Sequence, residues 1–260
     1  MNITRNNTYI RPSLRQAEIF DLVAKRGQIS VGALAVKFDT SAETIRRDLT
    51  ALADAGQIRK IHGGARSLSP QGEGVFEIRM RRNALAKRLI AEKVATLVVP
   101  GKTVFLDTGS TTLICAEAMA RIKRLTVITN STRIAAIFAQ GAGHADVHML
   151  GGHYFSDNAQ TVGAQAISGA ARFRADMAII TVAAIDTGSA MDFSNDEAQV
   201  ARAMIVASTQ TVIVADHTKF NQTAPFNVCD LNGISMLVSD KAPSEMFRSA
   251  LNKANIDVHW

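Results

Sequence analysis

Two groups of residues in this sequence have the types and the spacing to bind an anion. The first is the pair Arg46 and Arg47 in "SAETIRRDL", because a guanidinium group can donate two hydrogen bonds to guanine. The second is "DTGSTT", residues 107–112, in which a glycine precedes three hydroxyl side chains. Hydroxyls and backbone amides at the start of a helix can bind a phosphate. Which ligand each group binds depends on the elements that position it.

Arg46 and Arg47 lie in a run of short elements that the spacing of apolar residues predicts. In order these are a helix over 13–26 capped by Ser13, an extended segment over 28–30, a helix over 31–38, a helix that begins after Ser41 and ends near Gly56, and a hairpin over 57–68. The apolar face of the third helix turns both arginines toward solvent. Three helices followed by a basic hairpin predict a winged helix-turn-helix domain over residues 1–68.

Such a domain places its third helix in the major groove of DNA. The start of that helix and the hairpin would contact phosphates, which makes binding sensitive to salt. Asp48 is expected to orient a neighbouring arginine. The alternative for Arg46 and Arg47 is a solvated helix face, and both interpretations stay open here. The residues predicted to contact double-stranded DNA are Ser41, Thr44, Arg46, Arg47, Arg59, Lys60 and Arg66.

The distribution of charge favours an anionic partner for the first segment. The chain has 260 residues and a formal net charge of +6. Residues 1–68 contain 11 Lys and Arg against 6 Asp and Glu, whereas residues 69–260 contain 18 against 17. Nearly all of the positive excess therefore lies in the first quarter of the chain, as expected of a polyanion-binding module joined to a neutral domain.

Residues 69–83 are polar at their start and predict a linker. Three arginines in it could approach DNA or lie in solvent: Arg79, Arg81 and Arg82. A helix is then predicted over 84–98, with four side chains turned inward: Leu85, Leu89, Val94 and Leu97. From Gly101 onward, short β-branched runs alternate with helical patterns, which predicts an α/β domain over 84–260 with a mostly parallel sheet covered on both faces. Its predicted strands are 103–107, 125–129, 146–150, 176–186, 211–216 and 235–240.

Ligands of such sheets bind beyond the carboxyl ends of the strands, where four polar loops are expected. The loop 107–112 suits a phosphate, although the same residues could simply cap a helix. Asp186 and Lys219 could bind the hydroxyls and phosphate of a sugar, or form a surface ion pair. The residues predicted to bind the ligand are Asp107, Gly109, Ser110, Thr111, Thr112, Asn130, Ser131, Gly151, Gly152, Asp186 and Lys219.

Both segments resemble the DeoR family of bacterial transcriptional regulators. In the first segment the resemblance rests on "TIRRDL" (44–49) and "HGGA" (62–65) at the family's spacing from Arg15. One departure is Thr40, which stands where the family usually has a hydrophobic residue. From about Ala86 to Trp260 the resemblance rests on "GKTVFLDTGSTT", "TVITNS", "LGG", "VGAQA", "EAQVARAMI" and "ADHTKF" in the family's order.

The resemblance implies a sensor domain whose fold is shared with ribose-5-phosphate isomerase and glucosamine-6-phosphate deaminase. It implies a phosphorylated sugar or polyol as effector, with its phosphate near the hydroxyls of residues 110–112. It further implies a repressor of sugar or polyol catabolic genes that the effector releases from its operator. "TVAAID" departs from the family's glycine-rich pattern at Val182 and Ala184, so the identity of the effector does not carry over.

Two other functions are compatible with parts of the sequence. A sugar-phosphate isomerase or deaminase could use Asp186 and Lys219 as acid–base groups, and an RNA-binding or nonspecific DNA-binding protein would also be basic. The basic first segment favours a regulator over an enzyme. We expect no cofactor. We also expect no metal, because His144 and His148 head into a strand that would separate them, and no cysteine or carboxylate set completes a tetrahedral site.

Compartment and assembly are expected from more general features. Two isolated cysteines, no secretory signal and no apolar run of membrane-spanning length predict a cytoplasmic protein with no membrane contact. Two-fold symmetric operators predict a homodimer or homotetramer.

Overall fold

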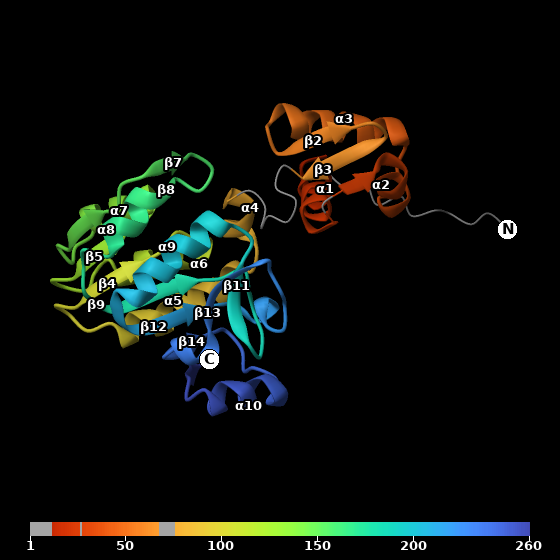
Figure 1. Ribbon diagram of the computed structural model, residues 1–260. Coiled ribbons are helices and arrows are strands. Elements are labelled where there is room, and N and C mark those ends of the chain that lie inside the picture. The colour runs from red at the N-terminus through yellow and green to blue at the C-terminus, as the bar shows by residue number, and fades with distance from the viewer. Residues whose placement is uncertain (1–11, 27, 68–75) are drawn as a thin grey trace. The chain divides into compact units, whose positions relative to one another are not determined.

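The computed structural model describes residues 12–26, 28–67 and 76–260 (Figure 1). They form two compact units, which divide between Ile78 and Arg79. Each unit has a hydrophobic core of its own, as expected of separate domains. Within these described ranges, no helix is both long enough and apolar enough to cross a bilayer.

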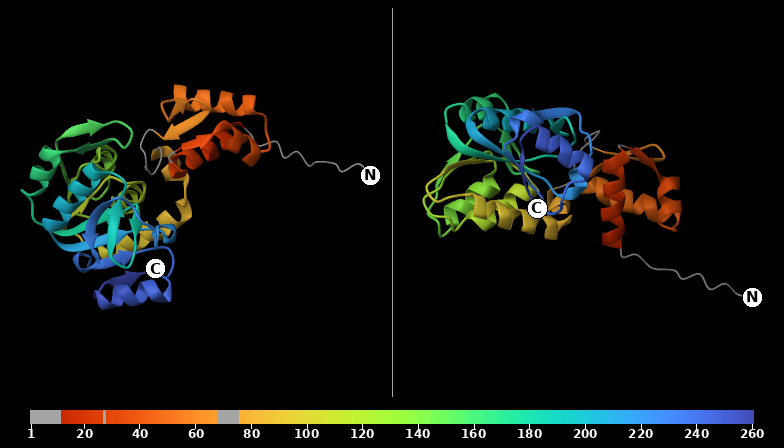
Figure 2. Two further views of the ribbon diagram at one scale, coloured as in Figure 1. Left: turned by 45° about the vertical axis from the view of Figure 1, so that its right-hand side comes forward. Right: turned by 90° about the horizontal axis from the view of Figure 1, so that it is seen from below.

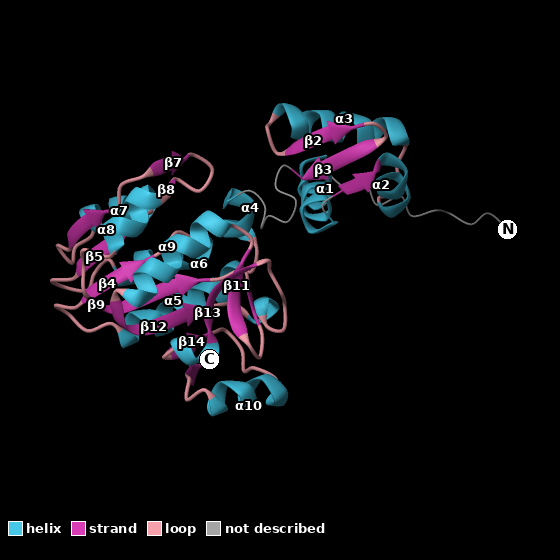
Figure 3. Ribbon diagram, in the orientation of Figure 1, coloured by secondary structure: helices cyan, strands magenta, loops and turns pink. Residues whose placement is uncertain are grey.

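The first unit has the order of elements that the sequence predicts (Figure 3). Its elements are α1 (Pro12–Arg26), β1 (Gln28–Ser30), α2 (Val31–Lys37), α3 (Ala42–Asp54), β2 (Ile58–Ile61) and β3 (Gly64–Ser67). The strands form an antiparallel sheet in the order β1-β3-β2. One detail differs from the prediction. Helix α1 already contains Ser13, which therefore lies in its first turn and is not its N-cap.

Local sequence explains where α3 begins and which face it buries. Ser41 is the N-cap, and its Oγ accepts a hydrogen bond from the Thr44 amide at 3.1 Å. Ile45 and Leu49 are almost completely buried in the core that α3 shares with α1 and α2. The turn between β2 and β3 contains Gly63 at φ +75°, a conformation that favours glycine.

The second unit is built on a seven-stranded sheet in the order β15-β14-β12-β9-β4-β5-β6, and each neighbouring pair is parallel. The predicted parallel sheet is therefore confirmed, with β15 as an additional edge strand. The strands are β4 (Thr103–Leu106), β5 (Thr126–Thr129), β6 (Asp146–Met149), β9 (Ala175–Thr181), β12 (Ser208–Val214), β14 (Met236–Val238) and β15 (Asp257–His259).

Helices cover both faces of this sheet. Helices α5, α6 and α7 pack in a row, α8 packs against α9, and the two groups lie on opposite faces (Figure 2). The covering explains why strands such as β4 and β9 are almost continuously apolar. The helices are α4 (Phe76–Arg81), α5 (Ala84–Leu97), α6 (Ser110–Met119), α7 (Thr132–Gln140), α8 (Ala164–Ala170), α9 (Asn195–Val206) and α10 (Glu245–Lys253), with short 3₁₀ turns η1 (His217–Lys219) and η2 (Leu231–Gly233).

Two small sheets were not predicted. The hairpin β7 (His153–Phe155) and β8 (Gln160–Val162) is one, and the sheet β10-β11-β13 is the other, with β10 (Ala184–Ile185), β11 (Ser189–Asp192) and β13 (Phe226–Asp230). The strand predicted over 176–186 is confirmed as β9 up to Thr181, but its predicted end is wrong. β9 ends at Thr181 because the chain then turns to pair with β11, beginning with a hydrogen bond from the Ala183 amide to the Met191 carbonyl.

The predicted linker and the predicted face of α5 also differ from the structure. Of the linker 69–83, residues 76–81 form α4, and residues 69–75 lie outside the described ranges. Leu85 and Leu89 are 72% and 37% exposed. Val94 is buried as predicted and Leu97 is half-buried, but the rest of the buried stripe of α5 is Ala86, Lys87, Ile90 and Ala91. Alanines in that stripe let α5 lie close to α6, an effect that the spacing of large residues alone does not reveal.

Candidate functional site

The outer face of α3 carries the two arginines that the sequence singled out. The side chains of Arg46 and Arg47 are 61% and 81% exposed. Glu43, one turn earlier, lies 3.4 Å from Arg46 Nη1 and 3.7 Å from Arg47 Nε. Exposed pairs of this kind contribute little to stability. The two guanidinium groups are therefore available to a partner at small cost.

Asp48 lies on the opposite, buried side of the same helix. Its Oδ2 accepts from Arg15 Nε at 2.6 Å, and its Oδ1 accepts from Gln16 Nε2 at 2.9 Å. Both residues belong to α1. Asp48 therefore does orient an arginine, but that arginine is in α1 and not in α3. The contact fixes α3 against α1, and so fixes the direction in which Arg46 and Arg47 point.

The hairpin β2–β3 brings further positive charge together. Arg59 and Arg66 are directly opposite each other on the two strands, and both are exposed. Like charges in this position repel each other. Lys60 is also exposed, and its Nζ donates to Thr50 Oγ1 of α3 at 2.9 Å. The hairpin thus concentrates charge that an anion would neutralise, and Lys60 ties it to α3.

In the second unit, the order of strands locates the site where ligands of such sheets bind. From β4 the chain proceeds through β5 to β6 on one side, and from β9 through β12 to β14 on the other. The direction of winding therefore reverses between β4 and β9, and the crevice beyond such a point is the usual ligand site of a parallel sheet. The loop 107–112 follows β4 directly and leads into α6. The predicted anion-binding loop thus lies at the reversal.

The polar residues of this loop are buried. Thr111 and Thr112 are 4% and 0% exposed. Asp107 bridges the reversal, because both of its carboxylate oxygens accept from the Thr181 amide at the end of β9, at 3.1 Å each. Burial raises the pKa of Asp107 well above its ordinary value, nearby Asp192 and Glu197 add to the rise, and the Thr181 hydrogen bond opposes it.

Gly109 is required by packing in this loop. A Cβ there would lie 2.2 Å from Thr181 Cγ2. The glycine thus lets the loop approach β9 closely, which brings the hydroxyls at the start of α6 to the reversal point. The hydroxyl of Thr112 donates back to the Gly109 carbonyl at 3.2 Å, whereas Ser110 Oγ accepts from Lys87 Nζ at 2.9 Å.

The second and third predicted loops adjoin the first. Asn130, after β5, accepts from Thr108 Oγ1 at 3.1 Å and donates to the Thr161 carbonyl at 3.0 Å. Ser131 Oγ accepts from the Ile134 amide as the N-cap of α7. These side chains are therefore engaged in positioning the loops. Gly151 is exposed with open space around it, whereas Gly152 has φ +135° and a Cβ on it would lie 2.4 Å from the Val162 carbonyl oxygen of β8.

The fourth predicted loop is arranged differently from the prediction. Asp186 follows β10, not a strand of the main sheet, and its Oδ1 accepts from the amides of Gly188 and Ser189 at 2.8 and 3.0 Å. Asp186 thus holds the turn between β10 and β11. Lys219 ends η1, whose neighbour Phe220 pairs with Ile185. Val182 and Ala184 are both buried, Val182 in the main core.

Several buried polar residues near loop 107–112 were missed from the sequence. Lys87 is 4% exposed, and Arg79 is 9% exposed and donates from Nη2 to Asn158 Oδ1 at 2.7 Å. The expectation that Arg79 lies in solvent or approaches DNA is therefore wrong. Glu197 Oε1 accepts from Asn158 at 2.9 Å and from Gln160 at 2.7 Å. The sequence did not distinguish Lys87, because "ALAKRLIAEKV" contains four charged residues and only the packing of α5 shows which of them is buried.

Gln160 contributes an unsatisfied acceptor to this region. The residue is 3% exposed and pairs with Ser131 through a backbone bridge. Its Oε1 has no hydrogen-bond partner among the described residues. A buried amide oxygen without a partner is costly, so its presence beside the loops suggests a bound hydroxyl or water in the functional state.

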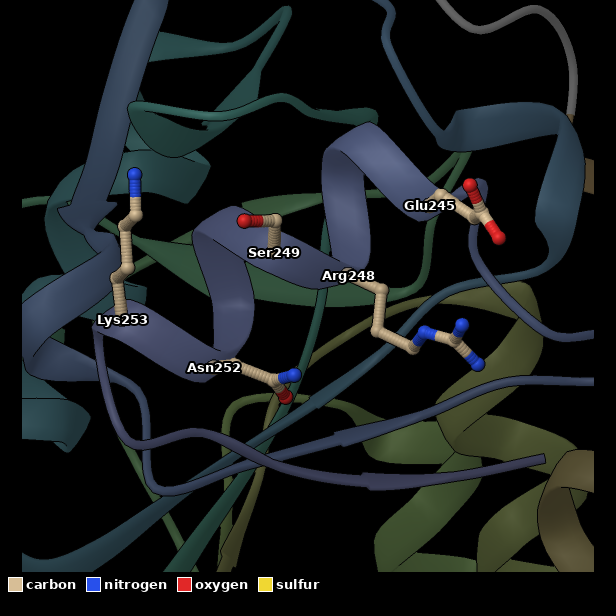
Figure 4. Close-up of a pocket in the computed structure, with 5 residues that line it drawn as sticks. All are labelled: Glu245, Arg248, Ser249, Asn252 and Lys253. Atoms are coloured by element: carbon tan, nitrogen blue, oxygen red, sulfur yellow. The ribbon is translucent and has the colours of Figure 1, made fainter.

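The second unit also has a surface hollow on α10, which none of the four predicted loops lines. Glu245, Arg248, Ser249, Asn252 and Lys253 line it, and all five project from α10 (Figure 4). None of them is a predicted site residue. Because one exposed helix supplies every side chain, the hollow lacks the converging groups of a ligand site.

Family models match both units of the chain. The DeoR C terminal sensor domain matches residues 82–241, and the DeoR-like helix-turn-helix domain matches residues 15–71. Among solved structures, ribose 5-phosphate isomerase A from Methanocaldococcus jannaschii is similar over 53% of this chain and 55% of that chain, with a TM-score of 0.40 and 16% identity. A similarity at this level has no bearing on activity.

Curated relatives are similar over nearly the whole length. The HTH-type transcriptional repressor CsqR of Escherichia coli strain K12 is 33% identical over 245 residues, which are 94% of each chain. The glycerol-3-phosphate regulon repressor of Haemophilus influenzae is 35% identical over 235 residues, covering 90% of this chain and 91% of that protein. With both family models matched in order and relatives aligned over 90% or more of the chain, the chain belongs to the DeoR family of helix-turn-helix transcriptional regulators.

Proposed function

We propose that this protein represses a sugar or polyol catabolic operon by binding its operator DNA, and that a phosphorylated sugar or polyol releases it. The observation that carries the proposal is the pairing of an exposed arginine face on α3 with a buried hydroxyl loop at the reversal point of the sheet. The names of relatives support it, since they include repressors of glycerol-3-phosphate and aga genes.

The DNA-binding half of the proposal assigns separate tasks to α3 and the hairpin. Arg46 and Arg47 read base edges in the major groove, and Thr44 contacts a phosphate near the start of the helix. Arg59 and Arg66 contact the backbone, where phosphate relieves their mutual repulsion. A homodimer or homotetramer would present two such faces to a two-fold symmetric operator.

The effector half assigns the phosphate to the start of α6. There the hydroxyls of Ser110 and Thr111 and the helix dipole favour an anion. The unsatisfied oxygen of Gln160 is suited to accept from a hydroxyl of the sugar or polyol. Asn130 and Asp107 act by holding the loops in place. We retain Asp186 and Lys219 as residues that contact the hydroxyls and the phosphate of the effector.

The alternative of a sugar-phosphate isomerase or deaminase needs Asp186 as an acid–base group. Its Oδ1 instead holds two amides of a turn, which gives the alternative no support. Incubation with pentose and hexose phosphates distinguishes the two functions, since an enzyme would turn one of them over.

The proposal is tested with the full chain and a duplex from the promoter region beside its own gene. Fluorescence anisotropy measures its affinity for that duplex and for an unrelated duplex of equal length, at several salt concentrations. We expect a preference for the promoter duplex that glycerol 3-phosphate, a pentose 5-phosphate or a hexose 6-phosphate abolishes. Equal affinity for both duplexes, with and without these compounds, would refute it.

A further inference from the structure

Lys87 is a charged residue enclosed within the second unit. It lies on the side of α5 that packs against α6 and is 4% exposed. Its Nζ donates to Ser110 Oγ at 2.9 Å and also to the backbone carbonyl of Arg79. The ammonium group thus connects the first residue of α6 with the last turn of α4.

The two contacts of Lys87 have opposite electrostatic character. Carbonyls in the last turn of a helix lack helical partners and favour a cation, so Lys87 stabilises the end of α4. The start of α6 favours an anion, and a positive charge beside it strengthens that preference. The position of the ammonium group therefore depends on whether an anion is bound at Ser110.

A second contact holds the same turn of α4 in the second unit. Arg79 Nη2 donates to Asn158 Oδ1 at 2.7 Å, and Asn158 Nδ2 donates to Glu197 Oε1 at 2.9 Å. The chain passes from the first unit to the second inside α4, between Ile78 and Arg79. Lys87 and Asn158 thus anchor the segment that connects the DNA-binding unit to the sensor.

We infer that Lys87 binds the phosphate of the effector and that this contact weakens its hydrogen bond to α4; the inference rests on the proposed function. Ser110 Oγ and Lys87 Nζ are 2.9 Å apart. A phosphate oxygen that accepts a hydrogen bond from Ser110 Oγ would therefore also be within reach of Lys87 Nζ. Phosphate is a stronger acceptor for an ammonium group than a neutral carbonyl. Binding therefore draws Nζ away from the Arg79 carbonyl and weakens the anchor of α4. The effector shifts the protein toward the weakly anchored state because it binds that state more tightly.

The test measures two quantities in the full chain. One is the affinity for glycerol 3-phosphate, a pentose 5-phosphate or a hexose 6-phosphate, whichever binds the unaltered protein, by calorimetry. The other is the release ratio, defined as the Kd for the promoter duplex with the compound divided by the Kd without it. The variants are Lys87→Met and Asn158→Ala, with Lys102→Met as the matched control. Lys102 is an exposed lysine immediately before β4, and it forms an ion pair with Asp176 of β9.

We expect Lys87→Met to lose at least ~10-fold in affinity for the compound, as for one charge-assisted hydrogen bond, and to have a release ratio near one. Asn158→Ala weakens the same anchor of α4, so by linkage it should raise the affinity for the compound while its release ratio falls. Lys102→Met should behave as the unaltered protein.

Either of two results would overturn the inference: unaltered affinity and release in folded Lys87→Met, or an unaltered release ratio in Asn158→Ala. If Lys87→Met does not fold, the release ratio of Asn158→Ala decides alone. Failure of the unaltered protein to bind any of these compounds is a separate result, which counts against the proposed function.

Discussion

Gly109 allows a sharp test of how loop 107–112 is packed. A Cβ at this position would lie 2.2 Å from Thr181 Cγ2 and 3.2 Å from both Thr181 Cβ and Thr112 Oγ1. Carbon atoms in contact are about 3.5–4.0 Å apart, so the loop or Thr181 would have to move by about 1.3 Å or more. Thr181 has little freedom, since Asp107 holds its amide. We expect Gly109→Ala to destabilise the second unit by about 1–3 kcal/mol, as overpacking does, and to lower its Tm by roughly 2–12 °C.

The measurement can be restricted to the second unit. Trp260 is the single tryptophan of the chain and follows β15, so its fluorescence reports on unfolding of that unit. Thr181→Ser removes the clashing methyl group and keeps the hydroxyl. The double variant Gly109→Ala/Thr181→Ser should therefore regain most of the lost stability, whereas Thr181→Ser alone serves as the control. A fully stable Gly109→Ala, or a double variant whose losses simply add, would refute this reasoning.

Three further predictions concern charge and titration. Replacing Arg46 and Arg47 by alanine should weaken binding of the promoter duplex by about 1–3 kcal/mol per lost base contact without changing the Tm, and unchanged anisotropy titrations would reject the recognition role. Burial raises the pKa of Asp107 in the folded state above its pKa in the unfolded state. The contribution of Asp107 to the free energy of unfolding is therefore complete below the unfolded-state pKa and is lost as the pH rises through the folded-state pKa. The unfolding free energy of Asp107→Asn relative to the unaltered protein should therefore increase with pH above about 4, and a constant difference would contradict this. Burial raises the pKa of Cys229 to about 12 and also raises that of Cys115, so neither thiol should react rapidly with Ellman's reagent at about pH 8 in the folded protein.

The elements of the first unit were predictable because their determinants are local. The cap of α3 is a hydrogen bond between residues three apart, Ser41 and Thr44. Its buried face follows the helical spacing of Ile45, Leu49 and Leu52. In the second unit the alternation of strands and helices was equally clear, since both faces of the sheet are covered and its strands are apolar throughout.

What the sequence did not reveal depends on partners distant along the chain. The buried face of α5 is set by the close approach of α6, and the role of Lys87 by a hydroxyl 23 residues away. Asn158 lies between the strands β7 and β8 of a short hairpin, and Gln160 begins β8. Strand β7 is exposed throughout and β8 is buried throughout, so neither strand has the alternating pattern by which a strand is predicted from sequence. Asp186 was expected at the end of a main-sheet strand, whereas β9 ends at Thr181 and Asp186 follows β10, which pairs with β11.

The two candidate sites present their polar groups in opposite ways, and the size of the ligand explains the difference. Duplex DNA cannot enter a cavity, so the groups that read it must project, as the 81% exposed side chain of Arg47 does. A small phosphorylated metabolite gains affinity only where the donors are already oriented and water is excluded, as around the fully buried Thr112. Orienting such donors requires a shell of residues that hold them, which is the part played by Asp107 and Asn130. A substitution in that shell should therefore impair the response to the metabolite while leaving the affinity for DNA unchanged.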